Sequence, residues 1–450
     1  MAADSTHAAQ QLASAAPMLT TLLKGADVSV VEQAAWALGN LVVDTSVVRQ
    51  AVLASGAVPA LARVFLQSVE TATRDAASLA CTVASAWACS ALLRGHCDAS
   101  QVEPTLEPAA QLAMQLLPEL DKPGAGAPKA AGEPPSARDA VFECLWLVAY
   151  LSATSDACAH TLAHNESYLL LLRRAAMSAI PMAGIPGVRA LGNVCCIPDS
   201  PAPRALLADI TFTRAMHTLL SAPFISAGGA AASAPSSEAA TARVQETLWF
   251  ISNLAGCGGD IVDAMLSAHF FQPVMQHFAT GKWHAALQAG RALLNMGTAP
   301  SPSAGPLGYM PRIISNEQAR ARVKELLGSG HVQGVQLGLS FCSAACDADP
   351  AHAPALLDGS GIREALTSLV YDGVDGAGEE QSEQLSSWAE HLLDAAFNAH
   401  DEAMDEDAAC APEATSATFS FGLAPSTQAS IRGTAQAVQP AWATPHPASS

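Results

Sequence analysis

Residues 31–44 read VEQAAWALGNLVVD, and this pattern returns in five later segments of the 450-residue chain. Each segment places a large residue four positions before a second key residue, usually polar, with small or aliphatic residues between them. The later segments are VASAWACSALLRG (83–95), VFECLWLVAYLS (141–152), GIPGVRALGNVCC (184–196), VQETLWFISNLAG (244–256) and LQAGRALLNMGT (287–298). Because four positions make about one helical turn, each segment predicts a helix that presents both residues on one face.

The spacing of the segments indicates a repeat. The large residues are Trp36, Trp87, Trp146, Arg189, Trp249 and Arg291, and the residues four positions later are Asn40, Ala91, Tyr150, Asn193, Asn253 and Asn295. Trp146 and Arg189 are 43 residues apart, and Trp249 and Arg291 are 42 apart. A period of about 40–47 residues is typical of armadillo and HEAT repeats. The other three intervals between these large residues are longer. Two of them contain Pro/Gly/Ala/Ser-rich stretches at about 123–137 and 226–240, which we interpret as flexible insertions.

The sequence therefore predicts an all-α fold: a right-handed superhelical solenoid of armadillo repeats over residues 10–398. Helix boundaries are also readable, because Gly56 is suited to end one helix and Pro59 to lie in the first turn of the next. Residues 399–450 begin with an acidic cluster and continue Ala/Pro/Ser/Thr-rich, so we expect a disordered tail.

Composition limits the partners. The chain has 22 basic and 41 acidic residues and a net charge of −19, which disfavours nucleic acid and anionic membranes and favours a basic peptide. The start shows no signal-peptide pattern, and the apolar run AVFECLWLVAYL (140–151) is too short to span a bilayer. The cysteines form no CxxC pair, so free thiols in a reducing compartment are expected.

A row of indoles with amides beside them has a physical use. Lys and Arg side chains can lie between such rings, and Asn can hydrogen-bond the backbone of an extended peptide. For a single Trp, burial in the core is the commoner reading. The recurring Asn four positions later favours a groove, because a buried amide without partners is costly.

The segments EQAAWALGN (32–40), followed by Asp44, and GVRALGN (187–193) resemble the importin-alpha family of nuclear import adaptors. The resemblance implies that the six segments are third helices of armadillo repeats, and that their groove binds Lys/Arg-rich nuclear localisation signals at two places. It also implies a protein found in the cytoplasm and the nucleus, without a cofactor.

Site residues follow from the same resemblance. The larger site would comprise Gln33, Trp36, Asn40, Asp44, Trp87, Glu143 and Trp146, with Asp44 holding the key Lys of the signal. The smaller site would comprise Arg189, Asn193, Glu246, Trp249, Asn253 and Asn295.

Some positions depart from the family pattern. Ala91 stands where the family has Asn, and Arg291 stands where it has Trp. The family also carries a basic N-terminal segment that binds importin beta, whereas residues 1–30 contain one base, Lys24. These departures leave an alternative open: a protein-interaction scaffold that kept the repeats and lost import.

Catalysis is not indicated. The sequence has no GxxxxGK[ST] loop, no GxGxxG that opens a helix and no GxSxG motif. His160 and His164, near Cys158, could form part of a metal site, but no HExxH arrangement or third ligand accompanies them. We therefore expect a protein that is not an enzyme and has no metal site.

Overall fold

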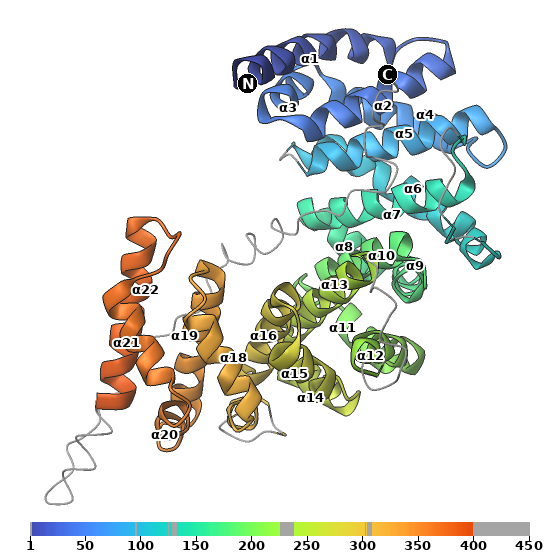
Figure 1. The fold of residues 1–450 in the computed structure, drawn as a ribbon. Coiled ribbons are helices and arrows are strands. Elements are labelled where there is room, and N and C mark those ends of the chain that lie inside the picture. The colour runs from blue at the N-terminus through green and yellow to red at the C-terminus, as the bar shows by residue number, and fades with distance from the viewer. Residues whose placement is uncertain are drawn as a thin grey trace, which may run out of the picture. The chain divides into compact units, whose positions relative to one another are not determined.

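The computed structural model describes residues 2–94, 97–124, 126–127, 133–225, 238–301, 303 and 308–398, and within them not the side chains of 2–10, 44, 223–225 and 398. Throughout this part of the chain the regular structure is helical, without a β-strand, so the all-α prediction is confirmed (Figure 1). The predicted tail lies outside the described residues, as do a smaller part of the insertion at 123–137 and most of the insertion at 226–240.

The chain divides into two compact units. The first unit holds the N-terminal helices and the first turns of α13 (Glu238–Ala255). Its complete helices are α1 (Ala2–Leu22), α2 (Val28–Asp44), α3 (Ser46–Ala54), α4 (Ala57–Val69), α5 (Ala76–Leu93), η1 (Ala99–Gln101), η2 (Glu103–Thr105), α6 (Leu106–Leu116), η3 (Leu117–Asp121), α7 (Ala137–Thr154), α8 (Asp156–His164), α9 (Glu166–Met177) and α10 (Pro181–Cys195).

The second unit holds the remainder of α13 and the C-terminal helices. These are α11 (Ala202–Ala208), α12 (Ile210–Ile225), α14 (Gly259–Ser267), α15 (Phe271–Thr280), α16 (Trp283–Thr298), α17 (Met310–Ile314), α18 (Glu317–Leu327), α19 (Val332–Ala348), α20 (Ala353–Asp358), α21 (Ile362–Asp372), α22 (Glu379–Leu392) and the π-helical turn η5 (Leu393–Asn398).

Local sequence signals set the helix ends. The Asp27 carboxylate accepts hydrogen bonds from the backbone N–H groups of Ser29 and Val30 and so caps α2. Gly56, with φ of +76°, separates α3 from α4, and Pro59 lies in the first turn of α4. The helix boundary predicted from Gly56 and Pro59 is therefore confirmed.

Each of the six repeated segments forms a helix: α2, α5, α7, α10, α13 and α16. In the first unit, α2 packs against α5, α5 against α7, and α7 against α10, which gives one continuous ladder (Figure 1). In the second unit, α16 packs against α19, and α19 against α22. The prediction that the segments stack as equivalent helices is confirmed for this ladder.

Helix α5 lies in the middle of the first unit. It has no charged residue over its 18 positions and is long and apolar enough to cross a membrane. Most of it is buried, and α2, α4 and α7 all pack against it. A helix covered on several sides is expected to be apolar around its whole circumference, so core packing accounts for this composition.

Candidate functional site

Helix α2 presents an accessible polar and aromatic face. Gln33, Trp36 and Asn40 are spaced at i, i+3 and i+7 and therefore lie along one side of the helix. Gln33 and Asn40 are exposed and Trp36 is half-buried. The side chain of Asp44, predicted to hold a Lys, lies outside the described residues. Of all the predicted positions, these three form the group most open to a partner.

Trp87 and Trp146 are buried, with 1% and 4% of their surface exposed. The expectation of an accessible row of indoles is therefore wrong at these two positions. Trp87 is enclosed because α2 carries Gly39 opposite it, where a Cβ would come within 2.7 Å of the indole. Trp146 is enclosed partly because it stacks on Tyr150 of its own helix, with ring centroids 5.5 Å apart.

Two arginines of the chain lie over these rings. The Arg94 guanidinium is 5.2 Å from the centroid of Trp87 and 5.0 Å from that of Tyr150. The Arg189 guanidinium is 5.7 Å from the centroid of Trp146. Cation–π attraction is thus already satisfied within the fold. Sequence reasoning missed Arg94, although its position two turns after Trp87 placed it on the same side of α5.

Glu143 is fully buried on α7. Neither of its carboxylate oxygens has a hydrogen-bond partner within the described structure, and the same holds for the indole N–H of Trp146. Burial raises the pKa of Glu143 to about 8, the Arg94 charge opposes this rise, and the Asp139 charge adds to it. The space between α5 and α7 thus combines aromatic faces, a guanidinium and an acidic group without hydrogen bonds.

The asparagines of two segments serve the fold itself. The Asn193 amide of α10 donates to the Ala149 carbonyl (3.2 Å) and the Ser152 hydroxyl (3.0 Å) of α7. The Asn295 amide of α16 donates to the Ser252 carbonyl of α13 (2.9 Å). Each asparagine therefore bonds the preceding repeated helix. The expectation that the recurring Asn lies in an open groove is wrong for Asn193, which is only 4% exposed.

An Asn193→Ala substitution should lower the free energy of unfolding by about 2 kcal/mol, because it removes two buried hydrogen bonds between α10 and α7. Asn40→Ala, at an exposed position, is the matched control and should change stability by less than about 0.5 kcal/mol. Urea denaturation of both variants measures the difference. Equal stabilities would show that the Asn193 bonds do not hold α10 against α7.

The predicted smaller site is divided between the two units. Arg189 and Asn193 belong to the first unit, whereas Glu246, Trp249, Asn253 and Asn295 belong to the second. Within the second unit, Glu246, Trp249 and Asn253 are half-buried along one side of α13. Arg291 is half-buried on α16, burial lowers the pKa of its guanidinium, and its Nη1 donates to Gln288 (3.4 Å).

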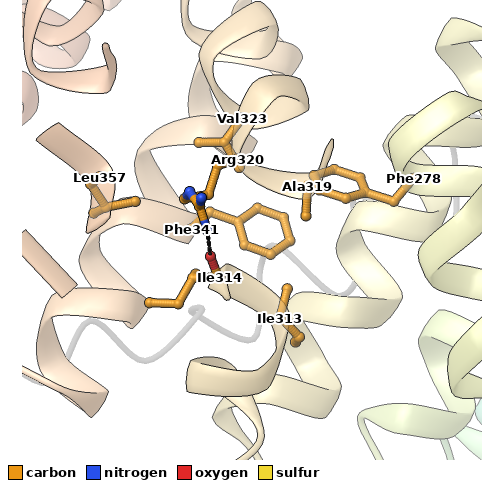
Figure 2. Close-up of a pocket in the computed structure, with 8 residues that line it drawn as sticks. All are labelled: Phe278, Ile313, Ile314, Ala319, Arg320, Val323, Phe341 and Leu357. Atoms are coloured by element: carbon orange, nitrogen blue, oxygen red, sulfur yellow. Dashed lines mark hydrogen bonds between the residues drawn. The ribbon is translucent and has the colours of Figure 1, made fainter. Parts of the chain in front are cut away.

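One enclosed cavity of the second unit is too small for an organic ligand. This apolar cavity is bounded by the stacked rings of Phe278 and Phe341 and by Arg320, which donates to the Ile314 carbonyl (Figure 2). Its volume is about 10 Å³, no more than one water needs. Across the described residues, no group of three or more His, Cys, Asp or Glu side chains could hold a metal ion.

Parts of the chain are similar to known proteins. Residues 6–43, which cover most of α1 and α2, match the armadillo/beta-catenin-like repeat family. A segment of 204 residues is 29% identical to importin subunit alpha-9 of Arabidopsis thaliana; it covers 44% of this chain and 34% of that protein. The matched region thus spans about a third of the curated relative's length.

Two solved structures are also similar. A designed armadillo repeat protein shares 14% identity, and the alignment covers 62% of this chain and 99% of that one, with a TM-score of 0.44. An engineered protein shares 16% identity over 62% of this chain and 95% of its own, also with a TM-score of 0.44. The repeat match at α1–α2 and the ladder of equivalent helices in the first unit agree with an all-α solenoid of armadillo-like repeats, an organisation suited to binding other proteins.

Proposed function

We propose that this chain is an adaptor that binds extended Lys/Arg-rich segments, such as nuclear localisation signals, along its repeated helices. The observation that carries the proposal is the open face of α2, where Gln33, Trp36 and Asn40 lie in line and remain accessible. The importin-alpha name of the relative in Arabidopsis and the net charge of −19 agree with a basic peptide as ligand.

Each residue of this face has a role in the proposal. The methylenes of a Lys side chain would lie on the Trp36 indole, with the ammonium group attracted to its ring face. Gln33 and Asn40, at either side of Trp36, would hydrogen-bond the peptide backbone, which provides affinity without selecting a sequence. The acidic surface would speed encounter with a cationic segment and make binding sensitive to salt.

The cellular role follows by analogy with the relative. Such an adaptor would carry basic cargo between cytoplasm and nucleus, with importin beta as a further partner. We propose this role on the importin-alpha resemblance alone.

Binding of a fluorescent Lys-rich signal peptide tests the proposal. We expect micromolar, salt-sensitive binding to the wild type, and binding weaker by about tenfold or more for Trp36→Ala. Trp283→Ala is the matched control: this indole is also half-buried, but it packs on His331 of the second unit and has Leu four positions later. Equal loss in both variants, or a wild type that does not bind, would contradict the proposal.

A second function is favoured by a different observation. Trp87 and Trp146 are buried, and Asn193 donates a hydrogen bond to α7. Many side chains of the repeated helices in the first unit therefore contact one another instead of a partner. A scaffold that holds a partner by other surfaces would have this organisation. It predicts a stable protein partner whose binding does not change with Trp36→Ala.

A further inference from the structure

The side chain of Arg94 lies between aromatic rings of two neighbouring helices. Arg94 follows the last turn of α5, and its guanidinium is close to Trp87 of α5 and Tyr150 of α7, at 5.2 and 5.0 Å from the ring centroids. The buried carboxyl group of Glu143 on α7 is near enough to interact with its charge. Two π faces, with a buried carboxyl group near them, form a receptor for an organic cation.

In the described part of the chain, Arg94 is held by ring contacts without an ion pair to support them. Among the described residues, its guanidinium has no carboxylate within ion-pair distance, and its buried Nε has no hydrogen-bond partner. Glu143 likewise accepts no hydrogen bond there. A buried Nε–H without an acceptor and a buried carboxyl group without a donor leave both side chains incompletely satisfied. Cation–π contacts of this kind can be exchanged for those of a competing Lys or Arg.

We propose that Arg94 is an intramolecular stand-in for a ligand cation: it occupies, between Trp87, Tyr150 and Glu143, the place that a Lys or Arg of a bound basic peptide would take. This inference rests on the proposed function. A peptide that enters at α2 would extend along α5 and α7 only after Arg94 leaves, so the residue limits the affinity of the wild type. Arg94 is half-buried and lies at the end of α5, so its side chain can move without a change in the helix.

Removal of Arg94 should therefore tighten peptide binding. If the receptor is open in about one molecule in ten, Arg94→Ala should lower the dissociation constant of the Lys-rich peptide by about tenfold. Arg74→Ala is the matched control, because it removes the same charge from an exposed position of the first unit. Equal affinities for the two variants would overturn the inference.

A second measurement does not depend on the peptide. The space left in Arg94→Ala should accept ethylguanidinium, a soluble mimic of the missing side chain. We expect millimolar ethylguanidinium to raise the thermal unfolding midpoint of Arg94→Ala, and to leave those of the wild type and Arg74→Ala unchanged. If Arg94→Ala does not fold, Arg94→Met, which keeps an aliphatic stem against the rings, takes its place in the peptide assay. Unchanged binding by that folded variant would equally overturn the inference.

The outcomes separate the two proposals. Rescue by ethylguanidinium without peptide binding to any variant would support the receptor and refute the proposed function. Peptide binding that depends on Trp36 but not on Arg94, without rescue, would support the proposed function and refute the role of Arg94.

Discussion

Glu143→Gln is expected to remove most of the fall in stability that the wild-type protein shows between pH 5 and pH 8. Burial raises the pKa of Glu143 from its ordinary value of 4.5 to about 8, against the opposing charge of Arg94. The folded chain therefore binds this proton more tightly than the unfolded chain does. The stability associated with the group is complete below pH 4.5 and is lost as the pH rises towards 8, by about 4 kcal/mol.

Urea denaturation at pH 5, 6, 7 and 8 measures this effect. The difference between variant and wild type isolates Glu143, because other groups that titrate, such as the buried His277, are present in both chains. Glu70→Gln makes the same change of charge at an exposed position of the first unit and should leave the pH profile nearly unchanged. Parallel profiles for wild type and Glu143→Gln would show that the carboxyl group is solvated and ionised at neutral pH.

The fold was largely predictable because it depends on local periodicity. The four-residue spacing within each repeated segment, and the break at Gly56 and Pro59, depend only on neighbours within one or two helical turns. Each repeated segment therefore forms its helix, and the segments of the first unit stack in the expected order.

The site was less predictable because its accessibility depends on contacts between repeats. Trp36 and Trp87 each lie in a repeated segment, yet only Trp87 is buried, since Gly39 of the preceding repeat leaves room for its indole. Arg94 contacts a ring of its own helix and a ring of α7, a helix 43 residues further along the chain. No pattern within one segment encodes such neighbours, so a Trp–Asn motif predicted the helix face but not what covers it.

The same dependence on neighbouring helices makes Gly187→Val the other substitution with a large expected effect. A Cβ at Gly187 of α10 would lie 2.6 Å from the Ala176 nitrogen and 2.9 Å from the Ala175 carbonyl carbon of α9. Both are backbone atoms, so no rotamer change relieves the clash, and α10 must move away from α9. We expect a loss of about 3 kcal/mol in the free energy of unfolding.

Gly187→Ala distinguishes this packing effect from helix propensity. Propensity alone would make alanine more stable than glycine by about 1 kcal/mol within a helix. The close approach of α9 predicts the opposite sign. Gly328→Ala is the matched control. A Cβ at Gly328 would lie 3.8 Å from the Lys324 carbonyl oxygen, and the φ of Gly328 is −88°, so alanine is tolerated there. Urea denaturation of the three variants gives the comparison. A more stable Gly187→Ala variant would contradict this prediction, because it would show that α9 shifts at little cost. Close backbone contact would then not fix the position of α10 and of its residues Arg189 and Asn193.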